Sequence, residues 1–323
     1  MADYGEVIYT ALETLIAVAC CVGNMLVIWA VWMCGALKHA TYCLILSLAV
    51  ADILVGAMAI PLAILVNGRA ETSFDGCLFI SCVVIVLTQA SVLSLLTIAI
   101  DRYLRVSIPL QYKRKVKVIH SWTAVAICWV TATLLGFIPM FGWSNRDSAA
   151  HFNTTIKCHF LTVIPMSYMV NFCFLSCLFP AMIIMTVLYC YIFCTISQQL
   201  KRGSGWTVNS RAYYIKEQKL ARLLALILTL FAVCWLPLHI MNILNFYSHC
   251  VSHNAFYVGI LLSHLNSAVN PIVYAFKAPR IKEPFRKAWR KLCLGQAKQL
   301  RVQGGQKAED NANSTTTSTA KST

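Results

Sequence analysis

The sequence predicts an all-α membrane protein, a seven-transmembrane helix bundle followed by a cytoplasmic amphipathic eighth helix. Two observations carry this prediction: the composition of the chain and the length of its apolar runs. Of the 323 residues, 59% are hydrophobic and only 12% are charged, whereas a soluble domain is about 45–50% apolar and about 25% charged. The apolar residues gather in runs of about 20 residues or more, which as helices cross ~30 Å of hydrocarbon.

Hydropathy defines seven such runs along the chain. They lie at about Val7–Trp32, Thr41–Val66, Cys77–Ile100, Ser121–Met140, Pro165–Ser197, Leu220–Phe246 and Ala255–Phe276. Prolines inside the runs predict kinks rather than breaks, because neighbouring helices or water can satisfy the freed carbonyl groups. These prolines are Pro61, Pro139, Pro180, Pro237 and Pro271.

The net charge of +15 is spread unevenly over the segments between the runs. One alternating set of segments carries 24 Lys and Arg residues, and the other set carries three. Because basic residues collect in cytoplasmic loops, we expect a multi-pass plasma-membrane protein with an extracellular N-terminus and a cytoplasmic C-terminus. This topology accounts for the basic charge without the nucleic acid partner that such a charge would suggest in a soluble protein.

Three cysteines fall in the segments that this orientation places outside, namely Cys77, Cys158 and Cys250. A Cys77–Cys158 disulfide would tie the start of the third run to the long outer segment before the fifth run. Cys250 would then be left over, either free or paired between two molecules. Asn153 begins an Asn-Thr-Thr sequon in the same outer segment, which predicts glycosylation.

Short polar and aromatic motifs occur at particular places in six of the runs. They are Gly23-Asn24, Leu48-Ala49-Val50-Ala51-Asp52, Asp101-Arg102-Tyr103, Trp129, Cys234-Trp235-Leu236-Pro237 and Asn270-Pro271-Ile272-Val273-Tyr274. In this order and at these spacings the chain, over about residues 7 to 295, resembles the rhodopsin-like (class A) G-protein-coupled receptors. One departure is Pro180, which lies one residue early relative to Tyr189 and puts the local kink geometry in doubt.

The resemblance implies that Asp101, Arg102 and Tyr103, together with Tyr274, serve activation and G-protein coupling. Arg102 cannot lose its charge, so at a membrane edge it needs an anionic partner or water. If Arg102 bridges to Glu217 at the start of the sixth run, that run is held inward in the resting state. The alternative is a solvated charge at the helix end.

The resemblance also implies an allosteric sodium ion in the middle of the bundle. Its ligands would be the oxygen atoms of Asp52, Ser91, Asn266 and Asn270, which suit a small hard cation. The alternative is a buried polar network that contains water and no sodium. No other cofactor is expected.

The residues expected around the outer pocket limit the ligand class. The seventh run has no lysine for a retinal Schiff base, and residues 82–86 are apolar where aminergic relatives carry an Asp. We therefore expect a neutral ligand that is flat or amphipathic. The sequence has no HExxH motif and no phosphate-binding glycine loop, and we do not expect an enzyme.

The residues around this pocket resemble those of the adenosine receptors. The matching stretches are Thr88-Gln89-Ala90-Ser91, Cys158-His159-Phe160, residues 235–242 and residues 259–264, together with Glu13. By that resemblance Phe160 would stack on the purine, and Asn242 would meet the adenine edge as donor and acceptor. The ribose hydroxyls would be reached by Thr88, Ser263 and His264, with Glu13 fixing the His264 tautomer. The other ligand-binding residues that the resemblance implies are Leu238, Met169, Ile260, His239 and Trp235.

The function implied is an adenosine receptor that activates a heterotrimeric G protein, of the inhibitory Gi type by resemblance. Leu161 follows Phe160 where some adenosine receptors carry Glu, which looks like the A-three subtype, whereas Gln89 and His239 look more like other subtypes. Two alternatives stay open: a receptor of the same family for another neutral small ligand, and a seven-helix transporter.

We expect the chain to divide into the seven-helix domain at residues 1–278, an amphipathic membrane-surface helix at 279–293 and a disordered tail at 294–323. The surface helix has Phe285, Trp289 and Leu292 on one side and basic residues on the other, which favours binding to membrane lipid. Cys293 at its end is predicted to be palmitoylated, the alternative being a reduced thiol. The Ser/Thr-rich tail suits phosphorylation by a receptor kinase and binding of arrestin.

Overall fold

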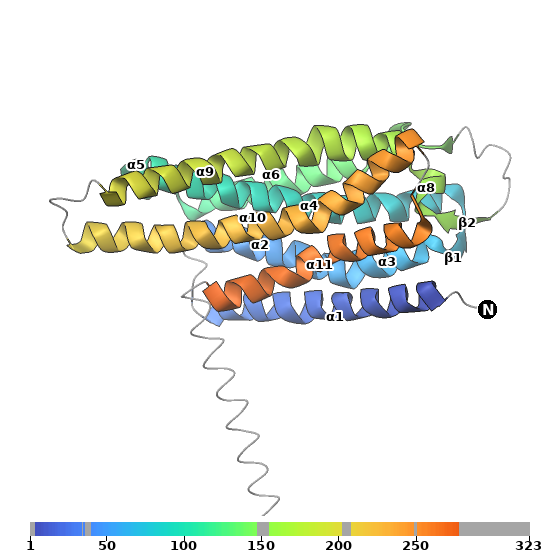
Figure 1. The fold of residues 1–323 in the computed structure, drawn as a ribbon, viewed down its shortest axis with the longest axis horizontal. Helices are drawn as coiled ribbons and strands as arrows, with labels where there is room; N and C mark the ends of the chain where they lie inside the picture. Colours follow the sequence, from blue (N-terminus) through green and yellow to red (C-terminus); the bar gives the residue numbers. More distant parts are fainter. Residues whose placement is uncertain are drawn as a thin grey trace, which may run out of the picture.

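The computed structural model describes residues 4–33, 35, 40–146, 155–201, 208–248 and 251–277. Long helices run side by side along the long axis of the molecule, and two short strands lie at the end where the chain begins (Figure 1). We call this end the strand end of the bundle. The long helical segments are α1 (Tyr4–Met33), α2 with η2 and α3 (Ala40–Leu54, Val55–Ala59 and Ile60–Leu65), α4 (Phe74–Ser107), α6 (Val118–Gly136), η4 with α9 (Tyr168–Leu178 and Phe179–Lys201), α10 (Val208–Ser248) and α11 (His253–Lys277).

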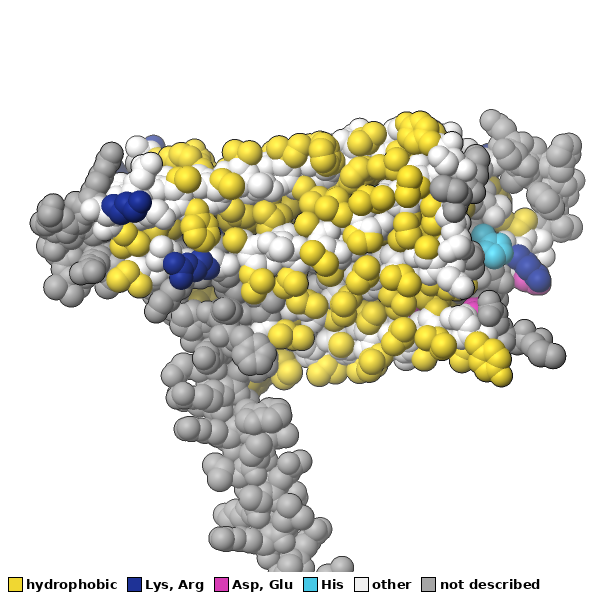
Figure 2. Space-filling view, in the orientation of Figure 1, with side chains coloured by type: hydrophobic (Ala, Val, Ile, Leu, Met, Phe, Trp, Pro, Cys, Tyr) yellow, Lys and Arg dark blue, Asp and Glu magenta, His cyan; other side chains and the backbone are white. Residues whose placement is uncertain are grey.

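The predicted fold class is confirmed. Within the described residues, six of these segments are long and apolar enough to cross a membrane, and α11 overlaps the seventh predicted run. Hydrophobic side chains cover the visible side of the bundle, whereas charged side chains gather toward its two ends (Figure 2). A lipid-facing surface of this kind is what a membrane helix requires, because hydrocarbon offers charged groups no solvation.

The helix α4 lies at the centre of the bundle and packs against α2, α6 and α9, while α11 packs between α1 and α10. Leu48, Ile98 and Phe231 belong to the buried apolar core that joins these helices. Two motif residues add polar contacts between helices. The Trp129 indole donates to the Ser47 hydroxyl at 3.1 Å, and the Asn24 amide donates to the backbone oxygen of Ser267 at 3.1 Å.

The prolines behave differently from one another. Pro237 and Pro271 lie inside the continuous helices α10 and α11, and Pro61 lies in the first turn of α3, directly after a π-helix. The expectation of a kink at Pro139 within the fourth span is wrong. The helix α6 ends at Gly136, and Pro139 lies in a separate 3-10 helix, η3 (Ile138–Phe141). A proline fits the first turn of a new helix, because the N–H group that it lacks would have no partner there.

The early proline of the fifth span coincides with a change of helix type. Residues Tyr168–Leu178 form a π-helix, and the regular helix α9 begins at Phe179, one residue before Pro180. The Ser176 hydroxyl donates to the backbone oxygen of Asn171, five residues back, at 2.8 Å. A proline has no N–H group that could bond the carbonyl group four residues before it. The wider π-helix before Pro180 therefore accommodates a proline that lies one residue earlier than usual.

The strand end carries a two-stranded antiparallel sheet that hydropathy did not predict. The strand β1 (Asn67–Thr72) pairs with β2 (Ile156–His159), with Asn67 opposite His159 and Thr72 opposite Ile156. The predicted Cys77–Cys158 disulfide is present and joins β2 to the first turn of α4. The short helix α8 (Phe160–Val163) follows β2 directly, so the bond and the sheet together fix where α8 begins.

Candidate functional site

A cavity of about 260 Å³ opens between the helices at the strand end of the bundle. Most of its lining is apolar, with a small number of polar groups, which is the usual make-up of a small-molecule site. Nine of the eleven residues predicted to bind the ligand line it. They are Thr88, Phe160, Met169, Trp235, Leu238, Asn242, Ile260, Ser263 and His264.

Phe160 is held on the cavity wall by its backbone. Its amide N–H donates to the backbone oxygen of Val66 at 3.0 Å, and Cys158, two residues earlier, is bonded to Cys77 of α4. The Phe160 ring is therefore carried by a segment that is attached both to the end of α3 and to α4. A fixed aromatic face of this kind can stack on a flat ligand.

Asn242 supplies the main polar group on the α10 side of the cavity. Its side chain is 6% exposed, and its carboxamide offers both a donor and an acceptor. Leu238 lies one turn earlier on α10 and also lines the cavity. A flat ligand edge with a neighbouring donor and acceptor would match Asn242, while its face contacts apolar carbon.

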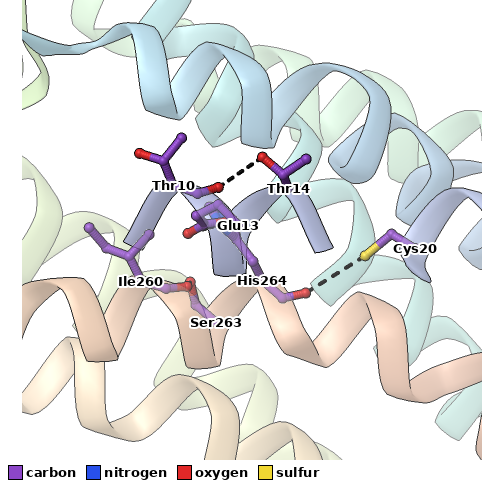
Figure 3. A network of polar contacts seen from close by, with 7 residues as sticks. All are labelled: Thr10, Glu13, Thr14, Cys20, Ile260, Ser263 and His264. Carbon is purple, nitrogen blue, oxygen red and sulfur yellow. Dashed lines mark hydrogen bonds and ion pairs between the residues drawn. The ribbon is translucent and has the colours of Figure 1, made fainter. Parts of the chain in front are cut away.

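Ser263 and His264 of α11 face the same cavity, and His264 is tied to α1 (Figure 3). The Nδ1 atom of His264 lies 2.8 Å and 3.0 Å from the two carboxylate oxygens of Glu13. Glu13 is fully buried and does not line the cavity, so its predicted role of orienting His264 fits the geometry. With Nδ1–H donating to the carboxylate, a neutral His264 presents Nε2 as an acceptor.

His239 does not line the main cavity, contrary to the prediction that grouped it with the other ligand-binding residues. It lines a smaller cavity of about 40 Å³, which also has Gln89, Cys173 and Trp235 in its wall. The His239 ring stacks between Phe174 and Trp235, with centroid distances of 4.8 Å and 5.8 Å. The turn of α10 that aims Asn242 at the main cavity therefore directs His239, three residues earlier, toward η4.

The Asp52 carboxylate is fully buried in the middle of the bundle. It accepts hydrogen bonds from the Ser91 hydroxyl at 3.2 Å and from the Asn270 amide at 2.8 Å. Asn266, the fourth predicted sodium ligand, is buried one turn before Asn270 on α11. Ser267, the residue after Asn266, is also buried and lies near the Asp52 carboxylate; it was missed because a serine in an apolar helix gives no signal of its direction.

At the opposite end of the bundle, Asp101 joins three elements. It accepts hydrogen bonds from Thr41 of α2 at 2.9 Å and from Tyr112 of the short helix α5 (Pro109–Lys115) at 2.5 Å. Arg102 Nη2 lies 3.4 Å from the same carboxylate. Burial, and next the charge of Asp101, raise the pKa of the Tyr112 phenol, so it remains a neutral donor.

Thr41 and Tyr112 were not among the predicted residues of this end. Tyr103 was, and its ring packs edge-on against Tyr191 of α9 with centroids 5.1 Å apart. The side chains of Glu217 and Tyr274 lie outside the described part of the structure, so the Arg102–Glu217 bridge stays a prediction. Also outside the described residues are Asn153, Cys250, Cys293, the helix at 279–293 and the tail at 294–323.

Residues 23–274 match the family described as the 7 transmembrane receptor (rhodopsin family). The chain belongs to this family of receptors. Its members are receptors rather than enzymes, which confirms that part of the prediction.

Curated relatives include the adenosine receptor A3 of sheep (Ovis aries), which is 41% identical over 284 residues, covering 88% of this chain and 90% of that protein. The adenosine receptor A3 of cattle (Bos taurus) is 41% identical over 281 residues, covering 87% and 89%. That of the dog (Canis lupus familiaris) is 40% identical over 282 residues, covering 87% and 90%. The resemblance to the adenosine receptors is confirmed.

The hydrogen bond between Tyr112 and Asp101 predicts a measurable contribution to the stability of this receptor. Tyr112→Phe keeps the ring and removes the donor, and a hydrogen bond to a charged group contributes about 1.5–3 kcal/mol. We expect a lower melting temperature of the purified receptor in detergent. Tyr103→Phe, in the same end of the bundle, is the matched control, and equal melting temperatures of the two variants would contradict the assignment.

Proposed function

We propose that this receptor binds adenosine, or a closely related nucleoside, in the cavity at the strand end and passes the signal to a heterotrimeric G protein. The observation that carries the proposal is the position of Phe160 and Asn242 in one cavity together with Ser263 and His264. The names of the relatives support the same ligand class.

The strand end is proposed to face the outside of the cell. The disulfide between Cys77 and Cys158 lies at this end, and disulfides persist in oxidising surroundings. The segments that would then face the cytoplasm carry 24 of the 27 Lys and Arg residues, as expected for cytoplasmic loops. A nucleoside released outside cells would reach the cavity without crossing the membrane.

In this assignment the adenine ring stacks on Phe160 and presents its edge to the Asn242 carboxamide. Leu238, Met169 and Ile260 contact the apolar surface of the ring. The ribose hydroxyls meet the polar groups of Thr88, Ser263 and His264. Since all these residues line one cavity, the base and the sugar can be bound at the same time.

Activation is proposed to be a shift between two arrangements of the helices. A ligand that contacts α4 and α11 favours the arrangement that brings these helices closer. Trp235 lies in the wall of both cavities, so its packing changes with the arrangement. An agonist that prefers the active arrangement ~100-fold shifts the equilibrium by about 2.7 kcal/mol. At the other end, release of Arg102 from its resting contacts would open a site for the G protein, which by family resemblance is of the Gi type.

Three further assignments rest on sequence alone. Asn153 is proposed to be glycosylated outside the cell, and Cys293 to be palmitoylated on the cytoplasmic side, next to a helix that lies on membrane lipid. The hydroxyl groups of the tail are proposed as sites for a receptor kinase and hence for arrestin.

Asp52 and its neighbours are proposed to hold a sodium ion. The buried carboxylate is contacted by neutral side chains within the described structure, and hydroxyl and amide oxygens suit a small hard cation. Asp52, Ser91, Asn266 and Asn270 would hold the ion, which would supply the positive charge that a buried carboxylate lacks. Since these residues come from α2, α4 and α11, a bound ion would favour one helix arrangement.

The proposed ligand is tested by Asn242→Ala. Loss of a donor and an acceptor, each contributing about 0.5–1.5 kcal/mol, should weaken the binding of a radiolabelled adenosine analogue by about 5- to 160-fold. The control is Asn245→Ala, three residues later on the same helix and away from the cavity lining. Unchanged affinity in the Asn242 variant, at equal surface expression, would defeat the purine assignment and favour another neutral ligand.

The role of Glu13 is tested by comparing two ligands on Glu13→Gln. A neutral amide orients His264 less strongly than a carboxylate, so nucleoside affinity should fall by about 3- to 30-fold. A xanthine, which lacks the ribose, should bind nearly as before. Glu6→Gln on the same helix is the control, and an equal loss for both ligands would show that Glu13 serves the fold rather than ribose recognition.

The sodium site is tested by Asp52→Asn. In the unchanged receptor, NaCl should lower agonist affinity several-fold relative to an equal concentration of choline chloride, and the variant should lose this difference. Asp75→Asn, an exposed aspartate at the start of α4, should keep it. Sodium sensitivity that persists in the Asp52 variant would leave the cluster a structural network.

A further inference from the structure

One side of the cavity rim is closed by a hydrogen bond between β1 and α11. The side-chain amide of Asn67 donates to the hydroxyl of Tyr257 at 3.1 Å. Both residues line the cavity, and Tyr257 is only 9% exposed. The two side chains thus bridge the strand that follows α3 and the outermost turns of α11.

The ring of Tyr257 is also held from the side of α1. It stacks on Tyr9 with ring centroids 4.3 Å apart and an angle of 19° between the planes. Tyr9 lines the same cavity and is 3% exposed. Stacking fixes the plane of the Tyr257 ring, and its hydroxyl is directed toward Asn67 of β1.

Asn67 is fixed by the sheet that carries the stacking phenylalanine. It lies opposite His159 in the strand register, and the residue before it, Val66, accepts the backbone hydrogen bond of Phe160. Movement of Asn67 away from α11 would therefore disturb the segment that contacts the ligand. Leu161, the next residue after Phe160 and part of the same rim, is apolar and 45% exposed.

We propose that the Asn67–Tyr257 hydrogen bond is a latch across the ligand passage between β1 and α11, and that it sets how fast the ligand enters and leaves. The inference rests on the proposed nucleoside ligand. The bond joins two parts of the protein and involves no ligand atom. Opening it is therefore a step common to entry and exit, and Asn67 acts as a positioning residue rather than as a ligand contact.

This role has a kinetic signature that a direct contact lacks. Removing a latch lowers the barrier in both directions, so the association and dissociation rate constants should rise together by about 2- to 13-fold, the range that corresponds to one hydrogen bond. The equilibrium dissociation constant should change by less than about twofold. Loss of a direct ligand contact would raise the dissociation rate and weaken the affinity in proportion.

The test uses the full chain in lipid nanodiscs and a radiolabelled adenosine analogue. Tyr257→Phe keeps the ring and its stacking on Tyr9 and removes only the hydroxyl, and Asn67→Ala removes the donor. We expect both variants, and the double variant, to show the same acceleration, because one bond is lost in each case. The control is Glu71→Gln, in the same strand but paired with Lys157.

Unchanged rate constants in Tyr257→Phe would overturn the latch, as would faster dissociation with proportionally weaker affinity. If Asn67→Ala reduces the number of folded receptors, the conservative tyrosine variant decides the matter alone. Absence of saturable binding in the unchanged receptor would overturn the proposed ligand and the latch together. Normal binding with unaltered rates in the variants would overturn the latch only.

Discussion

The hydrocarbon around the bundle cannot hydrogen-bond the protein, and the rest of the structure depends on this constraint. Every backbone N–H and C=O group within the membrane must find its hydrogen-bond partner inside the chain. A helix satisfies all of these groups within a single run of this length. Where the winding departs from the α-helix, as in η4 before Pro180, a buried or locally bonded geometry replaces the regular pattern. Among the described segments, η4 contributes Met169 to the walls of both cavities, and the two strands lie at the strand end.

The same constraint applies to the three buried carboxylates of the described bundle. Glu13 is satisfied by His264 beside the cavity, Asp52 by serine and asparagine side chains in the middle, and Asp101 by Thr41 and Tyr112 at the far end. Each carboxylate joins different helices. Because burial of an unpaired charge is costly, each cluster stabilises a particular relative position of those helices, and a change in any cluster alters that position.

The fold was predictable because the length of an apolar run is a property of the sequence alone, and most of the cavity was predictable from motif resemblance. What escaped prediction depends on where side chains meet in space. His239 is directed toward η4 by the phase of α10, and Tyr112 reaches Asp101 from a short helix that hydropathy does not detect. The strand β1 is mostly polar, and β2 alternates buried and exposed residues over only four positions, so the position of Asn67 opposite His159 could not be foreseen.

The affinity of a ligand and the lifetime of its bound state are separate properties. In the proposed assignment they depend on different side chains of the bundle. Asn242 and His264 line the cavity, so in the proposed assignment they affect the difference in free energy between bound and free states. The contact of Asn67 with Tyr257 is made between two protein side chains, so in the proposed role it affects chiefly the barrier between those states. Only differential affinity for two helix arrangements can shift their populations. A sequence change in the rim can therefore alter how long a signal lasts while the strength of the response, which depends on α4, α10 and α11, stays the same.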